Sequence, residues 1–448
     1  MTRFAPSGPL RGELRPPPDK SISHRAALIG AMSDDPVEVE GYLDSADTRS
    51  TLEAVRSLGA VVEPSTGEKP GALNLKVDGI GVLGPGERAG DGEGSIDVGN
   101  AGTLLRLLPG WLAGQGRGAW TLDGDESIRR RPVDRIAAPL REMGAEVECR
   151  DGRLPPLEVT GGALHGISYD LPVASAQVKS CVLLAGLMAE GETQVTEPAL
   201  TRDHTERLLA GWGADIRVKE LRTLPTLGGG PVRRITVRRA DGLRGRRVVV
   251  PGDFSSAAFF LVAAALVEGS RVRLEGVGLN PTRIGLLGIL HRMGAFVEVE
   301  EGLETIEPMG AIVARHGPLE GTRVRAEEVP LAIDELPLVA LLGCFAEGTT
   351  VVSGAEELRN KESDRIATVV DGLRGLGAEI EAAEDGFSVH GTGALRGGRL
   401  DAHGDHRLAM LGAVAGLASE EGVEVVGMEV AGVSYPGFEA DLAALTRR

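Results

Sequence analysis

The stretch KSISHR, Lys20 to Arg25, follows three prolines and Asp19 and leads into the apolar run AALIGAM. Asp19 has the side chain of a helix N-cap, so we expect a helix that begins at Lys20. The first turn of a helix carries partial positive charge, which makes cations there unfavourable by roughly 0.3–1 kcal/mol. Two cations and two hydroxyls at this place, Lys20, Arg25, Ser21 and Ser23, therefore predict a binding site for an external anion.

Further cations stand near other expected helix starts. They are Arg106, Arg131 in RRRP, Lys361 and Arg365 in LRNKESDR, and Arg407 in DHR. Any one of them could be a solvated surface charge or a member of an ion pair along a helix. Their recurrence at matching places in an acidic chain instead favours a small cationic cleft. The segment GNAGT at 99–103 offers small residues and backbone N–H groups, as phosphate-binding loops do.

Two carboxylates accompany these cations. Asp334 precedes an apolar helix, so it is either an N-cap or a proton acceptor, and Glu362 directly follows Lys361. A carboxylate held against cations in a closed cleft can act as an acid or a base. The sequence has no Walker A motif, no dinucleotide fingerprint, no zinc-like His/Cys spacing and no nucleophile elbow. We therefore expect acid–base chemistry on an anionic substrate, without a metal.

Composition narrows the class of protein. The chain has 448 residues, 42% of them hydrophobic, and a length that predicts two to three domains. A net charge of −17 argues against nucleic acids and anionic membranes as partners. Two of the three cysteines, Cys181 and Cys344, lie in apolar runs, which indicates buried thiols and a reducing cytosol. No apolar run approaches the roughly 20 residues of a membrane span.

The chain contains an internal repeat. The pattern occurs as VRSLGAVV, LREMGAEV, LAGWGADI, LHRMGAFV and LRGLGAEI, beginning at residues 55, 140, 209, 290 and 373. Each copy predicts the end of an amphipathic helix, a Gly C-cap and a strand. A second helix and strand precede each copy, and a sixth, partial copy begins at HGDHRLAM. We expect six α/β units of roughly 70–80 residues, three in each of two domains, whose first helices could converge on one anion site.

These segments together resemble the EPSP synthase (3-phosphoshikimate 1-carboxyvinyltransferase) family of enolpyruvyl transferases over essentially the whole chain. The matching motifs, in family order, are PPDKSISHRA, VGNAGT, RRRP, ASAQVKS, TRDHTERLL, GDFSSAA, LNPTR, EELRNKESDR and DHRLAM. The resemblance implies an α/β fold of two similar lobes, each made of three pseudo-symmetric βαβαββ-type units. It implies an inside-out α/β barrel, a double-stranded hinge and an active site in the cleft between the lobes. Residues 1–19 with 251–448 would form one lobe and residues 20–250 the other.

The family transfers the enolpyruvyl group of phosphoenolpyruvate to the 5-hydroxyl of shikimate 3-phosphate by addition and elimination, on the way to chorismate and the aromatic amino acids. By resemblance, the residues that bind shikimate 3-phosphate are Lys20, Ser21, Arg25, Ser175, Ala176, Gln177, Arg202, Asp334 and Lys361. Those that bind phosphoenolpyruvate are Lys20, Gly102, Arg131, Gln177, Arg365 and Arg407. The shikimate-phosphate lobe would be 20–250, and 251–448 would carry acid–base and phosphoenolpyruvate residues.

The resemblance also implies the catalytic residues, Asp334, Glu362 and Lys20. Asp334 would accept the proton of the attacking hydroxyl. Glu362, helped by Lys20, would protonate the methylene carbon and later remove a proton. Neither a metal nor an organic cofactor is needed. The family leads us to expect a cytoplasmic monomer with no nucleic-acid or membrane partner.

The sequence departs from the family pattern at Val433, where many members have a lysine that contacts phosphoenolpyruvate. Some members that resist glyphosate carry Ala at the position of Gly102, so the glycine here predicts some sensitivity. One alternative is the related UDP-N-acetylglucosamine enolpyruvyl transferase, whose loop usually carries a cysteine or aspartate before Arg-Pro; DGDESIRRRP has no cysteine. Another is a non-catalytic sensor of phosphorylated metabolites, which would need the cations but neither Asp334 nor Glu362.

Overall fold

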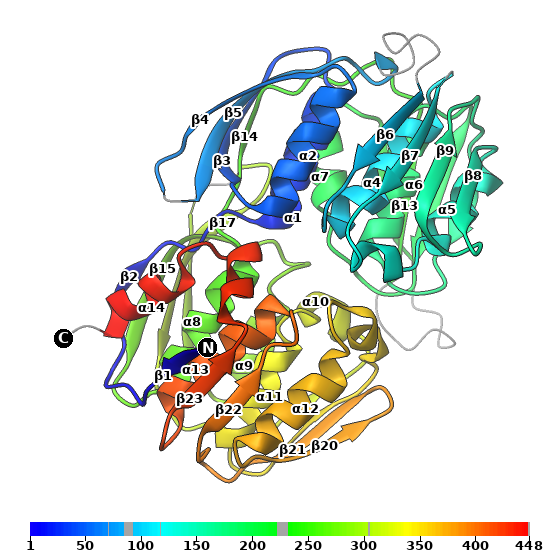
Figure 1. The fold of residues 1–448 in the computed structure, drawn as a ribbon. Helices are drawn as coiled ribbons and strands as arrows, with labels where there is room; N and C mark the ends of the chain where they lie inside the picture. Colours follow the sequence, from blue (N-terminus) through cyan, green and yellow to red (C-terminus); the bar gives the residue numbers. More distant parts are fainter. Residues whose placement is uncertain (70, 85–92, 117, 222–231, 303–304, 447–448) are drawn as a thin grey trace. The chain divides into compact units, whose positions relative to one another are not determined.

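The computed structural model describes residues 1–69, 71–84, 93–116, 118–221, 232–302 and 305–446. The chain divides into two compact units, which Figure 1 shows coloured by sequence. Unit 1 comprises Met1–Pro17 and Pro251–Arg448, and unit 2 comprises Pro18–Val250. The chain therefore passes from one unit to the other twice. None of the helices in the described ranges is long and apolar enough to cross a membrane.

In unit 2, helices and strands follow one another in a recurring order. They are α1 (Lys20–Ala31), β3 (Val37–Leu43), α2 (Ala46–Ser57), β4 (Val61–Thr66), β5 (Ala72–Asp78), β6 (Glu93–Asp97), α4 (Gly102–Ala113), β7 (Ala119–Asp123), η1 (Ile128–Arg130), α5 (Asp134–Glu142), β8 (Glu146–Arg150), β9 (Leu154–Thr160), β10 (Ser168–Asp170), α6 (Ala176–Gly186), β11 (Glu192–Glu197), α7 (His204–Gly211), β12 (Ile216–Leu221), β13 (Val232–Arg238) and β14 (Arg247–Val249).

Unit 1 has a similar recurring order of helices and strands. Its elements are β1 (Thr2–Phe4), β2 (Arg11–Leu14), α8 (Phe254–Leu266), β15 (Arg271–Gly278), α9 (Gly285–Arg292), β16 (Phe296–Glu301), β17 (Met309–Arg315), β18 (Arg323–Val324), α10 (Val329–Ala332), α11 (Leu336–Phe345), β19 (Thr349–Val352), η3 (Glu356–Asn360), α12 (Arg365–Gly375), β20 (Glu379–Ala383), β21 (Gly386–His390), β22 (Gly398–Asp401), α13 (His406–Ala418), β23 (Val423–Val426), η4 (Met428–Val433) and α14 (Phe438–Thr446).

One sheet topology recurs through both units. The described strands form six sheets, with orders β14-β3-β5-β4, β6-β7-β9-β8, β10-β11-β13-β12, β2-β15-β17-β16, β18-β19-β21-β20 and β22-β23-β1. In each sheet the first two strands run parallel and every further neighbour is antiparallel. In sequence, β6-α4-β7-α5-β8-β9 is a complete βαβαββ unit. The predicted sixfold repeat and mixed α/β class are therefore confirmed.

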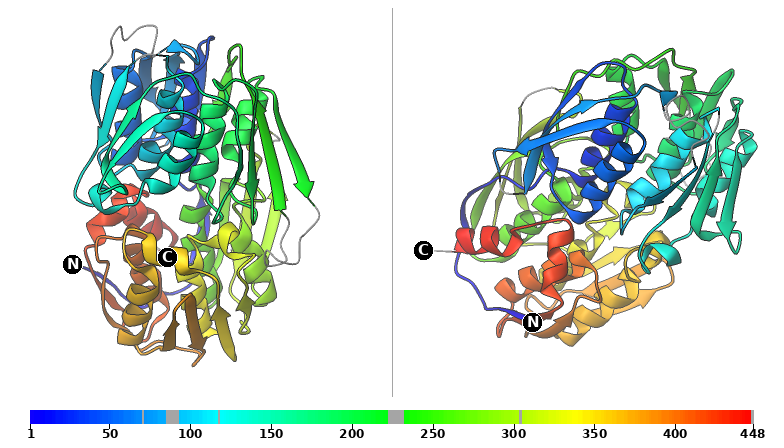
Figure 2. Two further views of the ribbon diagram at one scale, coloured as in Figure 1. Left: turned by 90° about the vertical axis from the view of Figure 1, so that its right-hand side faces the viewer. Right: turned by 45° about the horizontal axis from the view of Figure 1, so that its top comes forward.

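Two sheets take their first strand from a distant part of the chain. In unit 2, β14 pairs with β3, with Arg247 opposite Glu38. In unit 1, β2 pairs with β15, with Arg11 opposite Arg271, and β1 completes the sheet of β22 and β23. The blue N-terminal segment in Figure 2 runs beside the red helix α14, which packs on β2. The first residues of the chain are thus built into unit 1.

The glycine of the repeated pattern ends a helix in all five copies. Its backbone φ is positive at each position: 107° at Gly59, 100° at Gly144, 91° at Gly213, 81° at Gly294 and 100° at Gly377. This left-handed conformation strains any residue with a Cβ, and it turns the chain out of α2, α5, α7, α9 and α12 into the next strand. The predicted Gly C-caps are confirmed.

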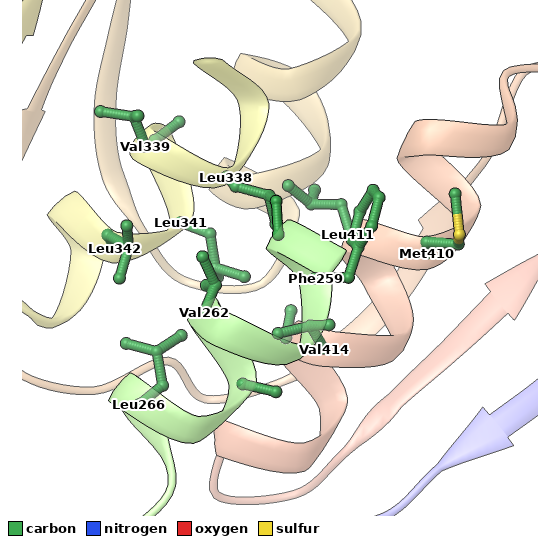
Figure 3. Close-up of a cluster of buried hydrophobic side chains, with 14 of the residues drawn as sticks. Phe259, Val262, Leu266, Leu338, Val339, Leu341, Leu342, Met410, Leu411 and Val414 are labelled. Atoms are coloured by element: carbon green, nitrogen blue, oxygen red, sulfur yellow. The ribbon is translucent and has the colours of Figure 1, made fainter. Parts of the chain in front are cut away.

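The first helices of the repeats form the cores. In unit 1, α8, α11 and α13 are apolar on all sides and pack against one another. Figure 3 shows their contact, with Val262 of α8, Leu341 of α11 and Val414 of α13 among the buried side chains. In unit 2, α4 and α6 approach so closely that a Cβ on Gly110 would lie 2.1 Å from the carbonyl oxygen of Cys181. Such tightly packed helices give rigid supports for the residues at their N-termini.

Candidate active site

In unit 1, Asp334 lies at the centre of a group of cations. It stands in the turn between α10 and α11, and the N-cap of α11 is Glu335, so the alternative of Asp334 as an N-cap is wrong. The Asp334 Oδ1 atom lies 3.3 Å from Arg365 Nη1 and 3.5 Å from Lys361 Nζ. Its Oδ2 atom lies 3.7 Å from Arg407 Nη2. Segments 27 to 73 residues apart in sequence therefore place three cations around one carboxylate.

Arg365 connects the carboxylates of this group. It is the first residue of α12, and its side chain is 1% exposed. Its Nε donates to Asp405 Oδ2 at 2.7 Å, and its Nη2 donates to Glu362 Oε2 at 2.7 Å. Burial alone would lower the pKa of Arg365, but the charges of Asp405 and Glu362 raise it above the usual arginine value. The guanidinium is thus a permanent cation that fixes Asp334 and Glu362 on either side of it.

Some side chains of the group around Asp334 are partly exposed to solvent, and others are nearly buried. The side chains of Lys361 and Glu362 are 28% and 26% exposed, whereas those of Asp334 and Arg407 are 10% and 11% exposed. An anion can therefore reach cations here without displacing buried packing. Two carboxylates next to that anion can take up and release protons.

A second group of buried residues fixes Glu335, the neighbour of Asp334. Arg283 Nη1 donates to Glu335 Oε1 at 3.2 Å, and its Nη2 donates to Asp253 Oδ1 at 3.2 Å. Ser255 donates a hydrogen bond to Glu335 as well. Asp253 caps α8 and Glu335 begins α11, so these bonds tie two helix starts together next to the cation group.

In unit 2, the start of α1 agrees with the prediction. Asp19 is the N-cap, and its Oδ1 accepts from the Ile22 N–H at 2.9 Å. Lys20 Nζ lies 3.1 Å from Asp47 Oδ2, with the lysine side chain 24% exposed. Burial alone would raise the pKa of Asp47, but the charge and hydrogen bond of Lys20 together with the charges of His24 and Arg131 outweigh burial, and the pKa is lowered. Lys20 is thus an accessible cation that an aspartate holds in place.

Arg25 faces the neighbouring helices and is buried. Its Nη1 donates to the Ser21 carbonyl oxygen at 3.0 Å. Its Nε donates to Thr205 Oγ1 at 2.8 Å, and its Nη2 donates to Ser180 Oγ at 3.1 Å. The arginine therefore links α1 to α6 and α7.

Gly102, the first residue of α4, faces two arginines. A Cβ at this position would lie 2.9 Å from Arg131 Nη1 and 3.0 Å from Arg106 Nη1. Arg131 Nη2 also donates to Asn100 Oδ1 at 3.1 Å. The glycine thus gives the guanidinium groups access to a helix N-terminus, where backbone N–H groups favour anions. The other two arginines of RRR, Arg129 and Arg130, are exposed, as the surface-charge alternative predicts.

The remaining predicted residues lie around α6 and α7. Ser175 caps α6 by accepting from the Val178 N–H at 3.4 Å, and Ala176 is the first helical residue. Gln177 Nε2 donates to Thr103 Oγ1 of α4 at 3.4 Å. Arg202 is half-buried in the segment before α7. Val433, the position of the missing lysine, is the last residue of η4 in unit 1.

Sequence reasoning missed several residues that hold the cations. The position of Asp405 in GDHR is typical of an N-cap, and Asp405 does cap α13 by accepting a hydrogen bond from the Arg407 N–H at 2.9 Å. Asp47, Ser180 and Thr205 have no local signal, because tertiary packing alone brings them to Lys20 and Arg25.

Comparison with known proteins decides the family. The model described as EPSP synthase (3-phosphoshikimate 1-carboxyvinyltransferase) matches residues 4–442. The chain belongs to the EPSP synthase family. It is 47% identical over 443 residues to a 3-phosphoshikimate 1-carboxyvinyltransferase of Acidithiobacillus ferrooxidans, covering 98% of this chain and 97% of that protein. It is 46% identical over 435 residues to one of Alkalilimnicola ehrlichii, covering 97% and 93%.

A solved member of the EPSP synthase family has the same fold. The EPSP synthase of Acinetobacter baumannii matches with a TM-score of 0.83 and 40% identity, covering 99% of this chain and 98% of that one. As a member of this family, the chain is a transferase of the shikimate pathway to aromatic amino acids. The family predicted from the motifs is confirmed, and neither alternative is supported.

Proposed function

We propose that the chain transfers the enolpyruvyl group of phosphoenolpyruvate to the 5-hydroxyl of shikimate 3-phosphate, with the residues of the two units acting together. The observation that supports this most is the group around Asp334. Two carboxylates, Asp334 and Glu362, share the buried cation Arg365, and further cations stand beside them. This combination suits a reaction that needs proton transfer next to bound anions.

Shikimate 3-phosphate binds through hydroxyls, an amide and cations. Arg202 pairs with its phosphate and Arg25 binds the same substrate, because a guanidinium can bind a phosphate or a carboxylate through two parallel hydrogen bonds. The other residues of this subsite are Lys20, Ser21, Ser175, Ala176, Gln177, Asp334 and Lys361. Asp334 accepts the proton of the 5-hydroxyl as that oxygen attacks.

Phosphoenolpyruvate carries a phosphate and a carboxylate, which the arginines neutralise. Its subsite consists of Lys20, Gly102, Arg131, Gln177, Arg365 and Arg407. Glu362, assisted by Lys20, donates a proton to the methylene carbon, and the shikimate oxygen bonds to the adjacent carbon. The resulting tetrahedral intermediate loses a proton from its new methyl group to Glu362, and the C–O bond to phosphate breaks. The products are 5-enolpyruvylshikimate 3-phosphate and phosphate, without a metal or organic cofactor.

The assigned residues come from both units, and the reaction needs both sets. Exclusion of water and alignment of the reacting atoms are worth several orders of magnitude in rate. The lobes are residues 1–19 with 251–448, and 20–250. The enzyme acts as a monomer in the cytoplasm, so light scattering should give a mass near 46.8 kDa.

The proposed reaction is tested by phosphate release from phosphoenolpyruvate. Purified protein should release phosphate with shikimate 3-phosphate, but not without it and not with UDP-N-acetylglucosamine. Release with the nucleotide sugar instead would assign the related transferase reaction. Binding of shikimate 3-phosphate without any release would assign a sensor.

A further inference from the structure

Lys179, near the start of α6, is fully buried, and the proposed chemistry does not use it. Its Nζ lies 2.8 Å from Glu197 Oε2 and 2.7 Å from Glu206 Oε1. It also donates to the carbonyl oxygen of Thr201 at 3.5 Å. Burying such ions costs several kcal/mol each, which their attraction often only balances. Stability alone is therefore a poor explanation of this triad.

The triad adjoins the hydroxyls that hold Arg25. Lys179 and Ser180 are neighbours on α6, and Thr205 and Glu206 are neighbours on α7. The Lys179–Glu206 ion pair therefore lies beside the hydrogen bond between Ser180 Oγ and Thr205 Oγ1, which is 2.7 Å long. Both hydroxyls accept hydrogen bonds from Arg25. The spacing of α6 and α7, which Lys179 fixes, thus determines the orientation of that guanidinium.

The triad also holds the segment that carries Arg202. Glu197, at the end of β11, accepts a hydrogen bond from Thr201 Oγ1 at 2.7 Å. It does so through Oε2, the same oxygen that accepts a hydrogen bond from Lys179 Nζ. Lys179 therefore contacts the residue before Arg202 directly and again through Glu197. Burial alone would lower the pKa of Lys179, but Glu206 and Glu197 raise it, so the lysine stays charged.

We propose that Lys179 is a positioning residue that orients Arg25 and Arg202 for the anionic groups of shikimate 3-phosphate. This inference rests on the proposed role of those two arginines in binding that substrate. A guanidinium binds a phosphate or carboxylate well only in a fixed orientation, so loosening it weakens binding of this one substrate. The residues assigned to phosphoenolpyruvate are held by other contacts, such as Asn100 for Arg131 and Asp405 for Arg365.

The test is a separate measurement of kcat and of KM for each substrate in Lys179→Met and Thr205→Val. We expect KM for shikimate 3-phosphate to rise about tenfold, the usual effect of weakening one charged hydrogen bond. The KM for phosphoenolpyruvate and kcat should stay within about twofold. Thr205→Ser keeps the hydroxyl and should restore the KM. Lys219→Met, on an exposed residue of β12, is the matched control.

An unchanged KM for shikimate 3-phosphate in folded Lys179→Met, or an equal rise for both substrates, overturns the inference. If that variant does not fold, Lys179→Met with Glu197→Gln and Glu206→Gln removes all three buried charges, and the same criteria apply; failure of both variants to fold assigns a purely structural role. Arg25→Gln separates the two proposals. If it leaves the KM unchanged, the assigned role of Arg25 is wrong, whereas a rise there without one in Lys179→Met rejects only the positioning role.

Discussion

Gly102 shows how the absence of one side chain shapes an anion site. We expect Gly102→Ala to raise KM for phosphoenolpyruvate, because its Cβ would lie 2.9 Å from Arg131 Nη1 and force that guanidinium to move. The unsubstituted enzyme should be inhibited by millimolar glyphosate at phosphoenolpyruvate concentrations near KM, and Gly102→Ala should be inhibited less. Steady-state inhibition kinetics measure both effects. Gly116→Ala, where the Cβ meets nothing within 4 Å, serves as the control; equal kinetics of Gly102→Ala and Gly116→Ala would contradict the account.

His24, a buried residue of α1, makes the stability of the protein depend on pH. Burial lowers its pKa from 6.5 to about 3, with the charges of Asp47, Lys20 and Arg25 as smaller influences. In the unfolded chain this histidine therefore binds a proton below pH 6.5, whereas in the folded chain it stays neutral down to about pH 3. The free energy of unfolding consequently falls as the pH decreases from 6.5 toward 3. At pH 5 this costs about 2 kcal/mol relative to neutral pH.

Urea unfolding at pH 7.5 and pH 5 measures this contribution. The loss of unfolding free energy between these pH values should be smaller in His24→Gln by about 2 kcal/mol. The exposed His165→Gln should behave as the unsubstituted protein does. An equal loss in His24→Gln would show that the imidazole is not held neutral by burial.

Single residues differ in how far sequence could identify them. Lys20, Asp334 and Arg365 stand at helix starts or next to oppositely charged residues, which makes them conspicuous in the sequence itself. Lys179 and Thr205 lie in helices, and the apolar pattern of those helices indicates only that these two residues are buried. Their contacts depend on how α6 and α7 meet, and no local pattern contains that information.

Among the elements, the helix ends were the most predictable feature. The Gly-Ala pattern requires a left-handed residue after a helix, and five glycines adopt that conformation. Gly213→Ala should lower the free energy of unfolding by about 1 kcal/mol, because φ is 91° there although the Cβ space is open. Gly288→Ala, inside α9 and equally open, should raise it by about 0.5–1 kcal/mol.

Denaturant unfolding of this matched pair isolates backbone strain from packing. Opposite signs would support the assigned C-caps. Destabilisation of both by the same amount would contradict the effect assigned to the positive φ of Gly213.

For the whole molecule, the sequence predicted the repeat and the mixed α/β class, since helix and strand signals recur in a fixed order. It could not predict that β14 completes the sheet of β3 and that β2 completes that of β15, because these short strands carry few pairing signals of their own. The residues assigned to one reaction are distributed over both units, Lys20 and Arg25 in unit 2 and Asp334 in unit 1. The proposed reaction requires that these residues act together.

The most direct test of that claim is phosphate release from phosphoenolpyruvate, with and without shikimate 3-phosphate, by the unsubstituted chain and by Asp334→Ala. Asp371→Ala, an exposed aspartate of α12 in the same unit, is the matched control. We predict release that requires both substrates, is retained in Asp371→Ala and falls by at least about 10²-fold in Asp334→Ala. Release by Asp334→Ala at the unsubstituted rate would contradict the assigned acid–base site.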